Sequence, residues 1–134
     1  MRRSTFHAVE KALEILASWN QAGMINRVIR LNRPQVWQGM DGGAQWNGQR
    51  MLIEPYIDNY IKFNSNTGWT LADGSAWSKV MQALSHYSYH LSGGQFVLCD
   101  LQGGIFKDGA ILSDPVVHSR AHDFGLTEGH QHLL

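Results

Sequence analysis

The N-terminal part of the chain has the apolar spacing of a helix. Apolar residues recur there at intervals of three and four, which predicts an amphipathic helix that buries one face. Ser4 or Thr5 can cap this helix, and Gly23 can end it. The residues predicted to face the core are Phe6, Val9, Ala12, Leu13, Leu16 and Trp19.

The stretch that follows favours strands. Apolar and basic residues nearly alternate over residues 24–38, and Pro34 marks an edge, a bulge or a break in that strand. A second, shorter strand is predicted at 60–63, followed by a polar loop at 64–68.

A hairpin is predicted between the two strand regions. Asn47 and Gly48 favour the positive backbone φ of a two-residue hairpin turn, and the returning strand is predicted at 49–57. Glu54 is followed by Pro55, which lacks a backbone donor and should end regular pairing. The returning strand carries the run Met51, Leu52 and Ile53, which we expect to be buried.

A second helix precedes a strongly apolar strand. Asp73 is the predicted N-cap, and the helix should end at Gly93 and Gly94. The strand predicted at 95–99 should be central and should deliver Asp100 at its end. The apolar stripe of the helix is Trp77, Val80, Met81, Leu84, Tyr87 and Leu91. Strands mixed with two main helices predict an α+β fold with an antiparallel sheet.

Composition narrows the class of protein. The 134 residues are 43% hydrophobic, which suits one domain with one core. Eleven basic and eleven acidic residues cancel, so nothing points to a nucleic-acid or membrane partner. No stretch approaches the roughly 20 apolar residues of a membrane helix. A single cysteine, Cys99, excludes an internal disulfide framework and fits a reducing compartment, the cytoplasm or the nucleus, of which we expect the cytoplasm.

Two polar residues directly after the apolar strand are candidate site residues. Asp100 and Gln102 are two positions apart, so on an extended backbone both side chains would point to one face and could approach one ligand or metal ion. The alternative is that Asp100 caps a turn and Gln102 faces solvent. From the pattern alone, this alternative is the stronger of the two.

Other polar residues carry weaker signals when taken singly. Asp114 precedes Pro115 and could form a simple turn, while Glu54 and Lys62 could be solvated strand charges. The sequence contains no P-loop and no Gly-rich loop, HRD or DFG motif of a conventional protein kinase. Four histidines close to the C-terminus could bind a metal or form a polar end: His118, His122, His130 and His132.

Several ordered blocks between residues 51 and 127 resemble the alpha-kinases, a family of atypical protein kinases that includes myosin heavy chain kinases and elongation factor 2 kinase. The long spacing between the two acidic residues of the catalytic loop most resembles fungal members. The matching blocks are 52–57 and 60–69 (hinge strand and Asn-rich segment), 84–89 (central helix), SGGQFVLCDLQG at 92–103 with 113–115 (catalytic loop), and 124–127 (start of the glycine-rich segment).

The resemblance implies an ATP-dependent transfer of phosphate to Ser or Thr of a protein. It implies that Asp100 orients or deprotonates the substrate hydroxyl and that Gln102 and Asp114 hold Mg²⁺ at the phosphates. It also implies that Glu54 contacts the adenine at the hinge. The fold would then be a partial alpha-kinase domain, with residues 1–57 as an N-lobe remnant up to the hinge and 58–134 as a partial C-lobe.

The resemblance also has gaps. The family's phosphate-binding lysine precedes the segment that matches here, and neither Arg2 nor Arg3 is a credible substitute. The family's zinc-binding cysteines have no counterpart, so no structural zinc is expected, and His86 should pack near Tyr87 and Tyr89. An alternative function is therefore a catalytically impaired module that binds nucleotide or protein. Exposed core faces could also require a partner chain.

Overall fold

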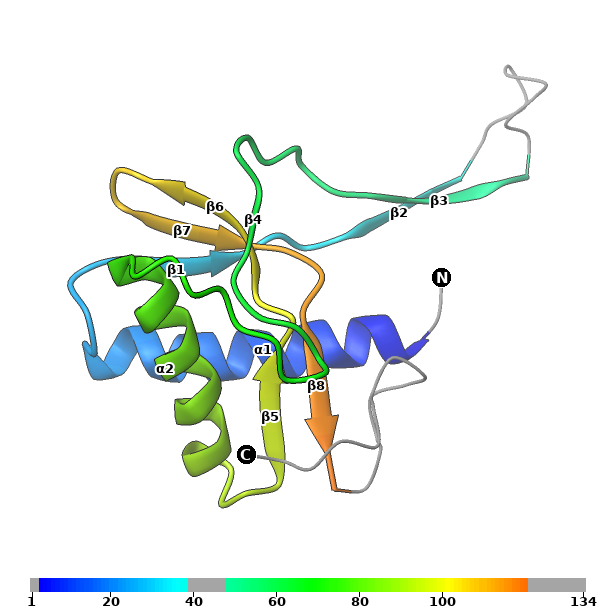
Figure 1. The fold of residues 1–134 in the computed structure, drawn as a ribbon. Coiled ribbons are helices and arrows are strands. Elements are labelled where there is room, and N and C mark those ends of the chain that lie inside the picture. Colours follow the sequence, from blue (N-terminus) through cyan, green and yellow to red (C-terminus); the bar gives the residue numbers. More distant parts are fainter. Residues whose placement is uncertain (1–2, 39–47, 121–134) are drawn as a thin grey trace.

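The computed structural model describes residues 3–38 and 48–120 and shows two helices with three small groups of strands (Figure 1). This arrangement confirms the predicted α+β class and the two main helices. Neither helix combines the length and apolar character needed to cross a membrane, within the described residues. In the described residues, the larger of two hydrophobic clusters draws on both helices, on β1 and β5 to β8, and on Phe63, while a smaller one contains Val97, Cys99 and Val116.

The first helix, α1 (Arg3–Ala22), packs against β1, β8 and α2. Its buried face includes Ala12, Leu16 and Trp19, as the spacing predicts. Gly23 follows the helix with a φ of 66°, which confirms the predicted stop. The predicted caps were wrong, because Ser4 and Thr5 lie inside a helix that begins at Arg3.

The main sheet brings together strands from both halves of the chain. Its order is β1 (Val28–Leu31), β7 (Gly109–Leu112), β6 (Gln102–Phe106) and β4 (Ile61–Lys62). Three of the strands are paired antiparallel, while β1 runs parallel to β7. Pairing of β4 with β6 places Ile61 and Lys62 directly beside the residues that follow Asp100.

The strands β2 (Gln35–Gln38) and β3 (Arg50–Ile53) form a separate antiparallel pair that extends away from the other strands (Figure 1). Pro34 lies in the break between β1 and β2, and regular pairing ends before Glu54, as predicted. The pair closes at Gln38 and Arg50, so the connection is much longer than a two-residue turn; Asn47 lies outside the described residues.

The predicted burial of the returning strand was wrong. Leu52 is 50% exposed, and its neighbours Met51 and Ile53 are only half-buried. The reason is that no helix or other strand packs extensively on this two-stranded sheet within the described part of the chain, so an apolar run alone cannot bury itself.

The second helix, α2 (Ala76–Leu91), packs against β5 (Phe96–Cys99) and is followed, after the C-cap Ser92, by the predicted stop Gly93 and Gly94, both with positive φ. Its N-cap is Ser75 rather than Asp73; the Asp73 carboxylate instead accepts hydrogen bonds from the Ser75 backbone and the Ser78 hydroxyl.

The prediction that the 95–99 strand is central was also wrong. Within the described residues, β5 pairs only with β8 (Val116–Ser119), in a two-stranded antiparallel sheet. It is nevertheless buried, because α2 covers it. The strand therefore still delivers Asp100 from a rigid element.

Candidate active site

Asp100 occupies the junction between β5 and β6, and its backbone has a φ of 58°. The expectation of an extended backbone at this point was therefore wrong. The positive φ turns the chain sharply, and Asp is one of the few non-glycine residues that adopt this conformation without a large penalty. The side chain is 16% exposed, so the carboxylate sits at the rim of the core rather than free in solvent.

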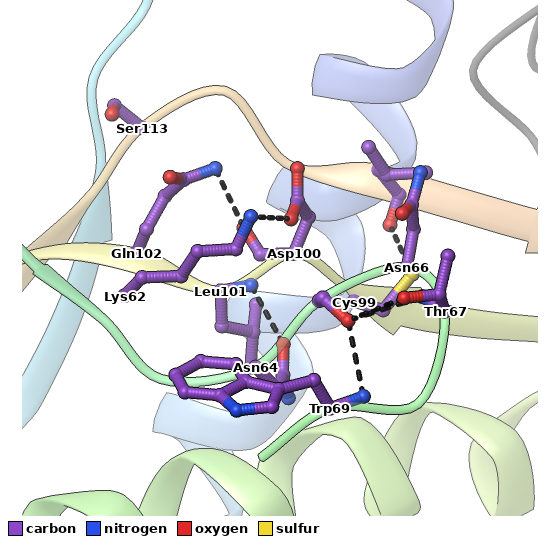
Figure 2. A network of polar contacts seen from close by, with 12 residues as sticks. Lys62, Asn64, Asn66, Thr67, Trp69, Cys99, Asp100, Leu101, Gln102 and Ser113 are labelled. Atoms are coloured by element: carbon purple, nitrogen blue, oxygen red, sulfur yellow. Dashed lines mark hydrogen bonds and ion pairs between the residues drawn. The ribbon is translucent and has the colours of Figure 1, made fainter. Parts of the chain in front are cut away.

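Lys62 is the charge partner of Asp100. Its Nζ lies 3.1 Å from Asp100 Oδ1, an atom that is buried and accepts no hydrogen bond within the described part of the chain (Figure 2). A buried carboxylate oxygen needs a compensating charge or donor, so the ammonium group holds this carboxylate in place. Interpreting Lys62 as a merely solvated charge was wrong. Lys62 reaches Asp100 because β4 pairs with β6 in a register that sets Lys62 opposite Gln102. This pairing joins residues far apart in the sequence, so the local pattern around Lys62 could not report it.

Gln102 begins β6 and is half-buried. The side-chain Nε2 of Gln102 donates a hydrogen bond to the Asp100 backbone carbonyl at 3.2 Å. The backbone carbonyl of Gln102 accepts a hydrogen bond from the Ser113 backbone N–H at 2.9 Å. Gln102 thus connects Asp100 to the segment that carries Asp114. The sequence-predicted pair, Asp100 and Gln102, does lie together, although the reason is this local bonding rather than an extended strand.

Asp114 lies at the turn between β7 and β8, with a φ of 51° and an exposed side chain. The preceding residue, Ser113, is buried, and its hydroxyl lies 2.7 Å from the Tyr60 hydroxyl. Tyr60 directly precedes β4, so this contact joins the start of β4 to the turn that carries Asp114. Two chain segments far apart in sequence are therefore joined beside the site.

A cavity of about 440 Å³ lies beside this turn, in the size range of small-molecule sites. Glu54 and Asp114 line it, together with Tyr60, Ser113 and the 55–57 segment. Burial raises the pKa of Glu54, and the negative charge of Asp114 raises that pKa further. The structure therefore brings two of the four predicted site residues to one cavity, with Asp100 and Gln102 a short distance along the sheet.

The raised pKa of Glu54 predicts a pH effect on stability. Because the folded state binds the Glu54 proton more tightly than the unfolded chain does, this contribution to stability is complete below pH 4.5 and is lost as pH rises through the raised pKa. Glu54→Gln should therefore gain stability relative to the wild type between pH 4 and pH 7. Melting temperatures measured across this range test the prediction. A difference between the two proteins that stays constant across this range would contradict it.

The site is acidic around Tyr60. Burial raises the pKa of Tyr60; the hydrogen bond with Ser113 opposes this shift, and the charges of Asp114, Glu54 and Asp100 add to it. Three carboxylates near one phenol suit a hard cation, and Mg²⁺ is commonly held by one or two carboxylates together with substrate phosphates. No group of three acidic, His or Cys side chains converges tightly within the described residues, so a metal here would depend on additional ligands.

A second cavity, of about 370 Å³, lies between the 64–70 loop, α2, β5 and β8. His86 and His118 line it, and the centroid of the His86 ring is 4.7 Å from that of His90. His118 is buried on β8, with Nε2 3.0 Å from the Asn66 carbonyl. The other candidate metal ligands, His122, His130 and His132, lie outside the described residues.

Comparisons with known proteins agree on one family. The model of the alpha-kinase family matches residues 3–132. The alpha-protein kinase vwkA of Dictyostelium discoideum is 40% identical over 68 residues, which are 50% of this chain and 11% of that protein. Human eukaryotic elongation factor 2 kinase is 37% identical over 75 residues, 54% of this chain and 10% of that protein.

The fold agrees as well. The alpha-kinase domain of myosin-II heavy chain kinase A, in complex with AMP-PNP, superposes with a TM-score of 0.68 at 25% identity. That match covers 94% of this chain and 49% of the other, so the chain spans about half of that domain and about a tenth of the curated relatives. From the sequence match along nearly its whole length and from the shared fold, this chain belongs to the alpha-kinase family.

Proposed function

We propose that this chain forms the catalytic-loop part of an atypical protein serine/threonine kinase that transfers the γ-phosphate of ATP to a Ser or Thr hydroxyl. The observation that carries the proposal is the Lys62–Asp100 ion pair at the end of a buried strand, beside the cavity of Glu54 and Asp114. Family membership supports it, because relatives such as elongation factor 2 kinase are protein kinases.

In this proposal Asp100 acts on the substrate hydroxyl. With Oδ1 held by Lys62, the carboxylate keeps a fixed direction and can accept the hydroxyl proton as the phosphoryl group is transferred. Phosphoryl transfer depends mainly on positioning and on neutralising charge, so a rigidly held carboxylate is the kind of group it requires.

ATP would lie across the adjacent cavity. Glu54, at the end of β3, would contact the adenine, while Gln102 and Asp114 would hold Mg²⁺ at the phosphates. The donor set fits this metal, because an amide oxygen and a carboxylate are hard ligands that leave positions for phosphate oxygens. When bound, Mg²⁺ would neutralise the charge on the phosphates. Support for ATP comes from the related domain, whose structure contains AMP-PNP.

Thermal stabilisation by Mg-ATP tests this placement. A ligand that binds only the folded state raises the melting temperature, so Mg-ATP should stabilise the wild type and Asp114→Ala should lose most of that shift. The matched control is Asp108→Ala, an exposed aspartate on the turn between β6 and β7, which should keep it. Equal shifts in the Asp114→Ala variant and in the control would remove Asp114 from the site.

The setting of the reaction is part of the same proposal. We propose a protein as the phosphate acceptor, in line with the family, and a cytoplasmic location, because the sequence has a single cysteine, Cys99, and therefore no internal disulfide. Fractionation of cells that express the full-length protein would test the location.

A further inference from the structure

The peptide unit that joins Asp100 to Leu101 is held at both ends. The Leu101 N–H donates a hydrogen bond to Asn64 Oδ1 at 2.8 Å, and the Asp100 carbonyl accepts one from Gln102 Nε2 at 3.2 Å (Figure 2). The next carbonyl, that of Leu101, accepts a bond from the Phe63 N–H at 2.8 Å. The backbone around Asp100 is therefore tied to the 63–64 segment.

This peptide unit closes the turn from which the Asp100 side chain projects. Asp100 has a φ of 58°, a conformation that persists only where its neighbours hold it. Without Asn64 the buried Leu101 N–H would lose its acceptor, and the ψ of Asp100 and the φ of Leu101 would change until that N–H found another partner. The turn would then shift relative to β4, and the carboxylate would leave its position 3.1 Å from Lys62.

Asn64 can hold the peptide unit because it is itself fixed. Its side chain is 4% exposed, and Nδ2 donates to Gln82 Oε1 and to Ser85 Oγ, each at 3.0 Å. Gln82 in turn donates to the Phe63 carbonyl at 2.9 Å. Since Gln82 and Ser85 lie on α2, one buried amide connects the helix to the backbone of Asp100.

We propose that Asn64 is a positioning residue for Asp100: it keeps the peptide unit between Asp100 and Leu101 in the orientation that presents the carboxylate to Lys62 and to the substrate. Asn64 itself touches neither substrate nor nucleotide. The catalytic half of this statement rests on the proposed function, whereas the effect on the Lys62–Asp100 pair does not.

The first experiment needs no enzyme activity. A double-mutant cycle with Lys62→Met and Asp100→Asn gives the coupling of the ion pair as a ratio of unfolding equilibrium constants, expected to be about fivefold in the wild type. In an Asn64→Ala background the factor should fall to about one, because the carboxylate has moved. A factor that stays near fivefold would overturn the proposal.

Ser88→Ala is the matched background. Ser88 also lies on α2, is fully buried, and accepts a bond from a β5 backbone group, the Leu98 N–H, at 2.8 Å, but it does not touch the Asp100 peptide unit. Ser88→Ala should lose stability and keep the fivefold coupling. Loss of coupling in both backgrounds would reduce Asn64 to a general packing role and overturn the proposal.

A milder variant covers the case in which Asn64→Ala does not fold. Gln82→Met has a similar volume and removes one acceptor of Asn64, so the coupling factor should fall to about half of its wild-type value. A factor equal to that of the wild type would contradict the claim that α2 fixes Asn64.

The second experiment measures catalysis. Asn64→Ala should lower kcat by about 10²-fold, the cost of a misplacement of about 1 Å, while KM for Mg-ATP stays within about twofold. Ser88→Ala should leave kcat within about twofold. A rise in KM with unchanged kcat would overturn the positioning role. If the wild type transfers no phosphate, the proposed function fails, and the double-mutant cycle still decides whether Asn64 positions the carboxylate.

Discussion

Asp100→Asn should lower the rate of phosphoryl transfer by about 10²- to 10⁴-fold, the range expected when a general base is removed. The substitution keeps the size and shape of the side chain, so the fold and the neighbouring cavity should survive. An amide cannot accept the proton of the substrate hydroxyl, and it also lacks the charge that pairs with Lys62. Transfer of radiolabel from γ-labelled ATP to a Ser/Thr peptide measures the effect.

Asp108→Asn is the control for this experiment, because Asp108 is an exposed aspartate at the turn between β6 and β7. It should transfer label at the wild-type rate. Equal rates in Asp100→Asn and the wild type would contradict the assigned role. If the wild type binds Mg-ATP but transfers no label, the chain acts instead as a catalytically impaired nucleotide-binding module.

Lys62→Met should reduce both stability and transfer. Removing the ammonium leaves the buried Asp100 Oδ1 without its charge partner, which should cost about 1–3 kcal/mol in the free energy of unfolding. Lys62 is 47% exposed, so the value should lie at the lower end of this range. The rate of transfer should fall by about 10²-fold, because the carboxylate loses its fixed direction. Chemical denaturation and label transfer measure the two effects.

Two comparisons separate this account from a general surface effect. Lys79→Met, at an exposed position on α2, should change neither quantity. The double variant Lys62→Met/Asp100→Asn should recover much of the lost stability, because no buried charge is left unpaired. If Lys62→Met behaved like Lys79→Met, the ion pair would have no role in holding Asp100.

The helices were predictable from the sequence, whereas the partner of Asp100 was not. The spacing of Leu16 and Trp19 in α1, and of Met81 and Leu84 in α2, reports directly which face is buried, because helical periodicity is a local property. Lys62 lies on a two-residue strand whose local pattern only marks it as exposed. Its role depends on the pairing of β4 with β6, which joins residues about forty positions apart.

The backbone conformation of Asp100 could not be predicted from the sequence either. The sequence placed Asp100 after a buried strand, but no local pattern predicts its positive φ. The side chains that bond to the peptide unit after it, Asn64 and Gln102, lie in segments whose pairing is non-local. The predicted burial of Leu52 was wrong for a related reason. An apolar run is buried only where another element covers it, and no local pattern reports that cover.

An NMR titration with Mg-ADP tests the central claim most directly, namely that Glu54, Asp100, Gln102 and Asp114 form one nucleotide site. The backbone amides of these residues should shift together with a single dissociation constant, while those of Trp69 and His86, at the other cavity, should stay unchanged. Shifts confined to Trp69 and His86, or the absence of any shift at millimolar Mg-ADP, would contradict the account.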